Sequence, residues 1–381
     1  MTAPKKKKIL ILQPGYHENS HHWSDLVEQI ILAFDPQRYD VVSAFFHGRP
    51  ESEHPQSRAA KAIYFNFPED WSDGLRLKMR RALSQFLAEE RFDAVICNRY
   101  KPVSLMMDLA PKLGIKACIG ISHSFGEYGR WWRRFRFARS VDERWRFVGV
   151  SVPVRDYLVG LGCGFTTANT VAINNAIDIE EAEKHFVERT EARKALGLPE
   201  GSVIVGAAGR LVSVKAHDVL IRAFARVAGR HPSAMLAVMG EGKKRPELEQ
   251  LIADLGVAQQ VRLLGFVAGA KRYLKGFDIW TMPSLKEGLG LALLEGMIAK
   301  LPVIASEVPA MSPIVRGADG YLVPPGNEEA LANAIDTCLR LSKEDRAEAG
   351  LKSFRFVREA HSIKAYHQAY RDLVEAMLER G

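Results

Sequence analysis

The sequence predicts an α/β protein built from two doubly wound parallel-sheet domains with a cleft between them. Short apolar runs of strand length alternate with amphipathic helical stretches along most of the chain, and this alternation restarts near residue 202. At 381 residues the chain is also longer than one typical hydrophobic core, so two domains are expected.

The strand-like runs and the helical stretches follow each other in order. In the first half the runs cover residues 8–12, 40–46, 93–97, 116–121, 147–150 and 170–173, and the helical patterns between them include 23–34, 75–90 and 102–113. In the second half the runs cover residues 202–206, 234–239, 261–264, 279–282, 303–305 and 321–323, and a last helical pattern covers 363–378. This rhythm is typical of parallel sheets, because each crossover between parallel strands needs a helix.

The domain boundary is predicted from composition. The segment from residue 178 to residue 200 is rich in charges and poor in large apolar side chains, which indicates a connection. We expect a first domain over residues 1–178, a linker over 179–200, a second domain over 201–358 and a C-terminal helix over 359–381.

Composition and charge limit the class of protein. Apolar residues make up 47% and charged residues 26%, which is typical of a globular protein, and no run approaches the roughly 20 apolar residues of a membrane span. The four cysteines lack metal-ligand spacing and indicate a reducing, cytoplasmic compartment. Residues 1–150 hold 24 Lys and Arg against 17 Asp and Glu, so an acidic partner should meet this half.

Two carboxylates, Glu287 and Glu295, follow the strand-like run 279–282 and its Pro283-Ser284 turn. Eight helical residues would span about 12 Å, whereas a glycosidase needs its two carboxylates roughly 5–9.5 Å apart. The spacing instead suits the two ends of an elongated ligand with phosphates between them. Taken alone, however, such a pair is more often two solvated side chains.

Two cations, Arg210 and Lys215, follow the first strand of the second half and its Gly206-Ala207-Ala208-Gly209 segment. The guanidinium is a planar fork and the ammonium a point charge, and together they suit a diphosphate. The alternative is a pair of surface cations engaged in ordinary ion pairs.

In combination, these residues resemble the retaining glycosyltransferases of family 4, which have the GT-B fold of two Rossmann-like domains facing a cleft. The resemblance covers nearly all of the second domain in order. Its segments are Gly209-Arg210-Leu211 with Lys215, Gly240-Glu241-Gly242, Leu264-Gly265-Phe266, Pro283-Ser284 with Glu287 and Glu295, and residues 301–306 and 320–326. It also implies that the C-terminal helix returns to the first domain.

The resemblance implies the catalytic residues. Arg210 and Lys215 would hold the diphosphate of the donor and stabilise the charge that develops on the leaving nucleotide. Glu287 would contact hydroxyls of the transferred sugar. His123, which follows the run 116–121, matches the histidine of the family at the reaction centre and would hydrogen-bond or align the donor sugar. Without the resemblance, a histidine after a strand is more often held by a backbone partner.

The resemblance also implies the residues that bind the donor. Glu295 would accept hydrogen bonds from the ribose hydroxyls, and the base would rest near Gly265 and Phe266. The remaining donor contacts would come from backbone at Gly15, Gly209, Gly288, Leu289 and Gly290. The chain has no D-x-D sequence, so we expect transfer without a metal ion or other cofactor.

The sequence departs from the family pattern at several positions. Gly15 alone remains of the glycine-rich loop after the first strand, and Ala176 replaces a glycine before the linker. Lys300 stands where a small residue or glycine is usual, and Pro313 stands where a glutamate is expected. We therefore assign no site role to the loop before Pro313.

An aromatic and basic segment over residues 129–139 is the candidate acceptor-side surface. Such a segment suits an anionic membrane surface or a phosphorylated glycolipid; the residues we expect to make this contact are Trp131, Trp132, Arg133, Arg134 and Arg136. The alternative is a partly buried helix whose arginines pair with Asp142 and Glu143. Because no nucleic-acid motif accompanies the segment, we do not expect binding to nucleic acid.

The sequence therefore predicts a retaining, metal-independent hexosyltransferase. It would use a nucleotide-diphosphate donor, a UDP-sugar, and a lipid-linked or cell-surface saccharide such as lipopolysaccharide core as acceptor. We expect it in the cytoplasm, with peripheral contact to the inner face of the cytoplasmic membrane. Two alternatives stay open: a nucleotide-sugar hydrolase or epimerase on the same fold, and a non-catalytic partner subunit that binds nucleotide-sugars.

Overall fold

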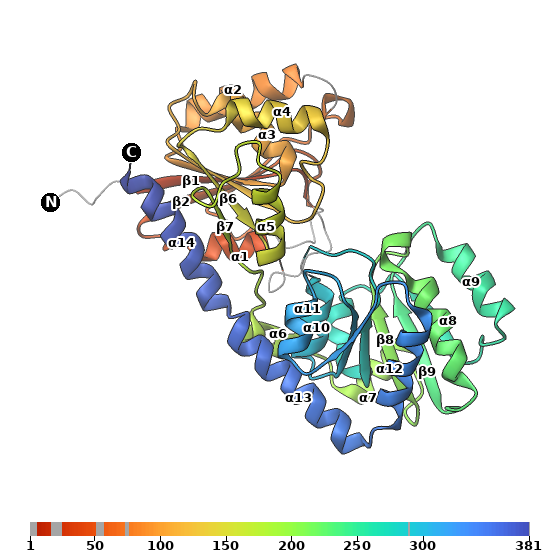
Figure 1. Ribbon diagram of the computed structural model, residues 1–381. Coiled ribbons are helices and arrows are strands. Elements are labelled where there is room, and N and C mark those ends of the chain that lie inside the picture. The colour runs from red at the N-terminus through yellow and green to blue at the C-terminus, as the bar shows by residue number, and fades with distance from the viewer. Residues whose placement is uncertain (1–5, 17–24, 51–56, 73–75, 289, 381) are drawn as a thin grey trace. The chain divides into compact units, whose positions relative to one another are not determined.

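The computed structural model of the chain describes residues 6–16, 25–50, 57–72, 76–288 and 290–380. Contacts divide the chain into two compact units: residues 1–176 with 363–381 form unit 1, and residues 177–362 form unit 2. Each unit holds one parallel sheet with helices on both of its faces, which confirms the predicted fold class (Figure 1).

The sheet of unit 1 has seven parallel strands in the order β3-β2-β1-β4-β5-β6-β7. This is the doubly wound order, and its direction reverses between β1 and β4. The strands are β1 (Lys7–Gln13), β2 (Tyr39–Phe45), β3 (Lys61–Tyr64), β4 (Ala94–Asn98), β5 (Ala117–Ser122), β6 (Trp145–Gly149) and β7 (Thr170–Ala172).

Helices cover both faces of this sheet. Figure 1 shows α2, α3 and α4 on one side of the strands and α1 and α14 on the other. The helices of unit 1 are α1 (Leu26–Leu32), η1 (Glu69–Ser72), α2 (Leu77–Glu90), α3 (Tyr100–Leu109), α4 (Trp131–Ser140), α5 (Val152–Gly160) and α14 (Ile363–Glu379).

The C-terminal helix α14 packs against α1, although more than 300 residues separate them in the chain. The hydroxyl of Tyr366 donates to the carbonyl of Leu26 at 3.2 Å, and the hydroxyl of Tyr39 donates to Glu375 at 2.6 Å. Helix α14 therefore belongs to unit 1.

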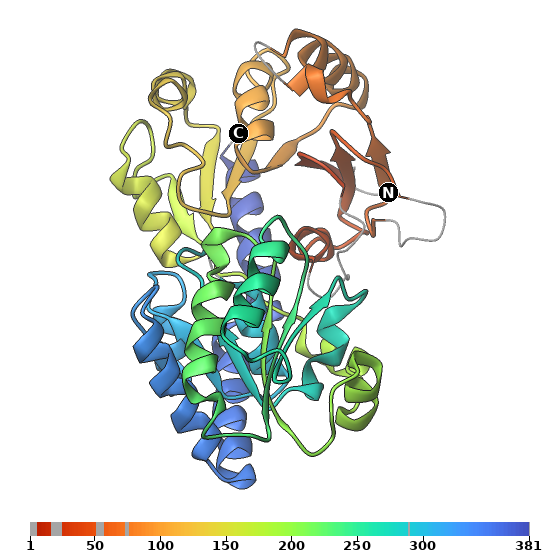
Figure 2. The same cartoon turned by 90° about the vertical axis from the view of Figure 1, so that its right-hand side faces the viewer.

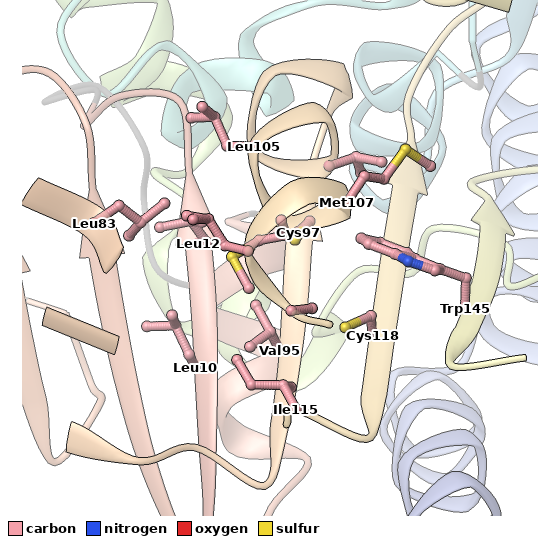
Figure 3. Packing of buried hydrophobic residues seen from close by; sticks show 14 of the residues in the cluster. Leu10, Leu12, Leu83, Val95, Cys97, Leu105, Met107, Ile115, Cys118 and Trp145 are labelled. Carbon is pink, nitrogen blue, oxygen red and sulfur yellow. The ribbon is translucent and has the colours of Figure 1, made fainter. Parts of the chain in front are cut away.

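The core of unit 1 forms because alternate residues of its strands face the same side of the sheet. Figure 3 shows Leu10 and Leu12 of β1 beside Val95 and Cys97 of β4, with Leu83 of α2 nearby. Both faces of the sheet are covered, so the central strand β1 is buried over residues 9–13 rather than alternating between buried and exposed.

The sheet of unit 2 has six parallel strands in the order β10-β9-β8-β11-β12-β13, and its direction reverses between β8 and β11. Figure 2 shows its strands with helix α8 (green) beside them. The strands are β8 (Val203–Ala208), β9 (Ala234–Met239), β10 (Val261–Gly265), β11 (Ile279–Met282), β12 (Val303–Ser306) and β13 (Tyr321–Val323).

Helices also cover this second sheet. They are α6 (Ile179–His185), α7 (Arg189–Leu196), η2 (Ser213–Lys215), α8 (His217–Ala228), α9 (Arg245–Asp254), η3 (Ala270–Gly276), α10 (Leu291–Ile298), α11 (Ser312–Gly317), α12 (Glu328–Arg340) and α13 (Lys343–Ala360). None of the helices among the described residues combines the length and apolar character that crossing a membrane requires.

The charged segment 179–200 folds as helices α6 and α7 within unit 2. Its charges are partly structural. The Arg193 side chain is fully buried, pairs with Asp278 at 2.6 Å and donates to the carbonyl of Gly276. This buried, paired arginine anchors α7 to the segment directly before β11. The charge content of the sequence alone could not indicate such a contact.

The predicted elements differ from the structure in a few places. Strand β3 was not predicted, because its side chains are only partly buried and show no clear alternation. Helix α3 begins at Tyr100 and ends at Leu109, earlier than expected at both ends. The expected starts of two helices, at residues 23–24 and 75, lie outside the described residues.

Candidate functional site

The loops after β8 and β11 meet at the carboxyl edge of the second sheet, where its strand order reverses. Ligands of doubly wound sheets bind at this position. The backbone N–H of Leu285, in the loop after β11, donates to the carbonyl of Val214 in η2 at 2.8 Å. This hydrogen bond holds together the two loops that carry the predicted cations and the first predicted carboxylate.

Lys215 and Glu287 form a direct ion pair, with Nζ of the lysine against Oε1 of the glutamate. Their side chains are only 20% and 13% exposed, so solvent screens the pair less than it would at the surface. The sequence predicted both residues as donor ligands but not that they contact each other.

Arg210 precedes Lys215 in the same loop after β8, and its side chain is exposed. Its side chain makes no ion pair with any residue that the structure describes. The preceding Gly209 has φ +153°, a conformation that favours glycine, and a Cβ there would lie 3.5 Å from Cε of Lys215. The loop thus carries an exposed arginine and a partly buried lysine.

A close backbone approach fixes the neighbouring strand ends. Gly240 has φ +145°, and a Cβ on it would lie only 2.0 Å from the carbonyl oxygen of Gly209. The N–H of Gly209 donates to the carbonyl oxygen of Met239 at 3.0 Å, and the N–H of Gly240 donates to the carbonyl oxygen of Gly265 at 2.8 Å. These contacts require glycine at Gly240 and bring the ends of β8, β9 and β10 together.

Glu295 lies in the second turn of α10 and is 6% exposed. Its Oε1 is 2.6 Å from Nζ of Lys271 in η3, a partner that sequence reasoning missed. Helix α10 begins only at Leu291, so the helical rise of about 12 Å does not describe the Glu287–Glu295 separation. Gly296 allows the helix to lie against Trp280, whose Nε1 donates to Ala292 at 2.7 Å.

The other predicted donor contacts lie on the same edge of unit 2. Gly265 has φ +76°, and the ring of Phe266 beside it is 62% exposed. Gly290 has φ +85° and is the N-cap of α10, and Gly288 precedes it in the loop. Leu289 lies outside the described residues. The roles of these residues stay predictions.

His217, the first residue of α8, lies near Lys215. It was not predicted from the sequence as a site residue. It is 4% exposed, and a Cβ on Gly209 would lie 3.8 Å from its Nε2. Burial and the charge of Lys215 lower the pKa of His217 to about 4, although the adjacent backbone of Gly209 and Arg210 acts in the opposite direction. The ring is therefore neutral at pH 7.

In unit 1, His123 follows β5 and contacts Asn98, the last residue of β4. Its Nε2 lies against Oδ1 of Asn98, which can only accept, so Nε2 carries the proton and Nδ1 is left as an acceptor. Burial and the nearby Arg99 lower the pKa of His123 to about 3. The ring is thus a neutral hydrogen-bond acceptor at Nδ1.

Gly15 follows β1, on the same edge of the first sheet. A Cβ on this residue would lie 3.6 Å from the carbonyl oxygen of His47, which is ordinary contact, and φ is not in the left-handed region. Neither the backbone nor the surroundings therefore require glycine here. Residues 17–24 of the loop that follows lie outside the described residues.

The aromatic and basic segment forms helix α4. Trp131 is 78% and Phe135 56% exposed, and they lie one turn apart on the same side of the helix. The arginines that the alternative would pair with Asp142 and Glu143 have other partners. Arg133 stacks on Tyr100 at 4.4 Å, Arg134 donates to the carbonyl of Leu161, and Arg136 pairs with Asp108.

The structure places both departures of unit 2, Lys300 and Pro313, at the ends of helices. Lys300 has φ +62°, a conformation that favours glycine, and its ammonium lies 4.9 Å from the ring of Phe354. Pro313 occupies the first turn of α11, where its missing N–H has no helical partner to lose.

Comparison with protein families covers both units. Residues 26–181 match the family described as Glycosyltransferase Family 4, and residues 188–352 match the one described as Glycosyl transferases group 1. The chain belongs to glycosyltransferase family 4. The family match agrees with the motifs at the edge of the second sheet.

Relatives and solved structures agree with this membership. The chain is 37% identical over 153 residues to D-inositol 3-phosphate glycosyltransferase of Nocardia farcinica, covering 38% of this chain and 34% of that one. It is 32% identical over 174 residues to the lipopolysaccharide core biosynthesis glycosyltransferase LpsE of Rhizobium meliloti, covering 44% and 50%. The matches span a third to a half of the length of such relatives.

Solved structures of the same fold cover almost the whole chain. Sucrose-phosphate synthase of Thermosynechococcus elongatus superposes with a TM-score of 0.81 at 20% identity, covering 99% of this chain and 100% of that one. HepE of Anabaena, solved in complex with UDP and glucose, superposes with a TM-score of 0.79 at 19% identity, covering 97% and 100%. At these identities the likeness establishes the GT-B fold.

Proposed function

We propose that this chain moves a sugar from a nucleotide-diphosphate donor, a UDP-sugar, to a lipid-linked or cell-surface saccharide such as lipopolysaccharide core. The observation that carries the proposal is the set of charges at the edge of the second sheet: Arg210 makes no ion pair with a described residue, and Lys215 is paired with Glu287. The UDP complex of HepE supports the choice of donor, and the name of LpsE supports the choice of acceptor.

The proposed chemistry is front-face substitution with retention of configuration. Arg210 and Lys215 bind the diphosphate and stabilise the negative charge that it gains as the bond to the sugar breaks. The incoming hydroxyl attacks from the same side and gives its proton to the departing phosphate. Because two protein cations supply the charge that a metal ion supplies elsewhere, we propose transfer without a metal.

The two carboxylates position the donor in this proposal. Glu287 accepts hydrogen bonds from sugar hydroxyls, and its ion pair with Lys215 holds the carboxylate in place. Glu295 accepts from the ribose hydroxyls, and its pairing with Lys271 fixes the carboxylate in one orientation. Phe266 offers an exposed ring to the base, and the backbone of Gly288 and Gly290 would contact the phosphates.

The groups of unit 1 have proposed roles on the sugar. His123 offers Nδ1 to a hydroxyl of the donor sugar, which a neutral ring can accept at any pH above about 4. Gly15 would contact the donor sugar through its main-chain atoms.

The test combines a donor screen with product analysis. Thermal unfolding with UDP-glucose, UDP-galactose, UDP-N-acetylglucosamine and GDP-mannose identifies the donor, since a ligand at a hundredfold excess over its Kd stabilises the native state by about 2.7 kcal/mol. The selected donor is then incubated with truncated lipopolysaccharide core, and proton NMR reads the anomeric configuration of the product. A retained configuration is expected, and an inverted one contradicts the mechanism.

The same experiment separates the alternatives. Rapid release of UDP from the donor without acceptor would favour the nucleotide-sugar hydrolase or epimerase. Tight donor binding without transfer to any acceptor would favour a non-catalytic binding subunit.

We also propose that α4 contacts an anionic membrane surface, where the lipid-linked acceptor lies. The exposed Trp131 and Phe135 would enter the interface, and the positive charge of the α4 arginines would attract anionic lipids. Sedimentation with phosphatidylglycerol vesicles tests this: Trp131→Ala with Phe135→Ala should weaken binding, and Leu77→Ala, an equally exposed apolar residue on α2, should not. Equal binding of all three proteins would overturn the proposal.

A further inference from the structure

Arg99, the residue that follows β4, has an unusual backbone conformation. Its φ is 71° and its ψ is 172°, a region that is essentially reserved for glycine and costs another residue about 1–3 kcal/mol. Its N–H donates to the carbonyl of Ile121 at 2.9 Å, which glycine would do equally well. The backbone therefore gives no reason for arginine here, and a reason must lie in the side chain.

The position of Arg99 is that of a ligand-binding loop. The order of the first sheet reverses between β1 and β4, so the loop of Gly15 and the Asn98-Arg99 segment flank the crevice position of this sheet. Asn98 holds the ring of His123 through Nε2. The guanidinium of Arg99 therefore lies close to the histidine that we assign to the donor sugar.

The charge of Arg99 is available for a ligand. The side chain is exposed and makes no ion pair with a residue that the structure describes. Arg99 has an electrostatic interaction with the carboxyl group of Glu127, whose Oε1 accepts the backbone N–H of His123 at 3.0 Å. Burial raises the pKa of Glu127, and the backbone N–H of His123 and the charge of Arg99 act to lower it.

We propose that Arg99 binds an anionic group, a phosphate or a carboxylate, of the acceptor saccharide. A guanidinium matches both groups with two parallel hydrogen bonds. The excess of basic residues in the first 150 positions would favour the approach of such an acceptor. This inference rests on the proposed function, since it names the class of acceptor for the same site.

The backbone strain provides a sharp test. Arg99→Gly removes the guanidinium and relieves the strained conformation, so it should unfold at the same or a higher temperature than the wild type while losing the ligand. Arg99→Lys keeps the positive charge but loses the two parallel N–H donors of the guanidinium. Arg91→Gly is the matched control, because Arg91 is an exposed arginine with φ 51° that precedes the same strand β4 at its opposite end.

Binding is followed by NMR titration of the full chain with glucose 6-phosphate, glucuronate and glucose. We expect glucose 6-phosphate or glucuronate, whichever matches the acceptor, to bind the wild type and Arg91→Gly alike. Arg99→Gly should weaken that binding at least about tenfold and Arg99→Lys less, as expected for the loss of a bidentate charged contact. Glucose should not distinguish the variants.

Two results would overturn the inference: Arg99→Gly binds both anionic sugars as the wild type does, or neither anionic sugar binds the wild type more tightly than glucose. A parallel titration with UDP separates this from the proposed function. If the wild type fails to bind UDP while the Arg99 effect persists, the proposed donor site is wrong and the anion site stands.

Discussion

The ammonium of Lys215 and the carboxylate of Glu287 form an ion pair that joins the loop after β8 to the loop after β11. The pair is mostly shielded from solvent and lies where the second sheet reverses its strand order. Lys215 thus contacts Glu287, the carboxylate to which we assign binding of the sugar hydroxyls. We assign binding of the diphosphate to Lys215 itself. In the proposed mechanism, the pair would couple recognition of the sugar to stabilisation of the leaving group.

Glu287→Gln should lower kcat/KM for the donor about 10- to 100-fold, because a hydrogen bond to a charged group contributes roughly 1.5–3 kcal/mol. The measurement is UDP release in the presence of donor and acceptor. Glu188→Gln is the control, since Glu188 pairs with Lys275 at 2.6 Å in the same unit but away from the loops. Equal rates for the wild type and Glu287→Gln would refute the role of Glu287.

Lys271→Met should destabilise unit 2 and weaken donor binding, because it leaves the buried carboxylate of Glu295 without its cation. We expect a loss of about 1–3 kcal/mol in the free energy of unfolding, below the cost of breaking a fully buried pair since Lys271 is partly exposed. The double variant with Lys271→Met and Glu295→Gln should regain part of this lost free energy of unfolding, as measured by urea denaturation. A double variant less stable than Lys271→Met would contradict this pairing.

Lys300→Gly should be more stable than Lys300→Ala by about 1 kcal/mol, because only glycine adopts φ +62° without strain. Both variants lose the contact of the lysine with Phe354, so their difference isolates the backbone. Thermal unfolding of the two proteins measures it. Equal stability would mean that the left-handed backbone at residue 300 carries no strain.

Acid should destabilise the protein partly through His123. Its pKa is about 3 in the folded state and about 6.5 when unfolded, so between these values the unfolded chain binds a proton that the native protein does not. Stability from this group is therefore present above pH 6.5 and is lost as the pH falls towards 3, by at most about 1.4 kcal/mol per pH unit. His123→Gln should show a shallower loss between pH 7 and pH 5 in urea denaturation; the same slope as the wild type would contradict the shifted pKa.

Much of the fold could be predicted because it depends on local patterns. Apolar runs such as residues 9–12 and 279–282 form central strands, and the glycines after β8 mark a loop at the sheet edge. The segment 179–200 was harder to predict. Arg193 and Asp278, more than 80 residues apart, form a buried pair that no local charge pattern reveals.

The positions of Arg210, Lys215, Glu287 and His123 could be predicted because they follow strand ends and family motifs, and their roles stay predictions. Lys271 was missed because it lies in an irregular 3₁₀ segment, and only the folded sheet brings it to Glu295. Arg99 could have been found with the rule that selected His123, since both follow strands of the first sheet. Its backbone conformation, however, depends on the tertiary structure.

The most direct test of the central claim, that the edge of the second sheet binds the diphosphate of a nucleotide donor, is calorimetric titration of UDP into wild type and Arg210→Ala. We predict that the wild type binds UDP and that Arg210→Ala binds it about 10- to 100-fold more weakly, as expected for the loss of a charged hydrogen bond. Arg226→Ala, an arginine of α8 paired with Glu328, should bind as the wild type does. Equal affinity of Arg210→Ala and the wild type for UDP would contradict the account.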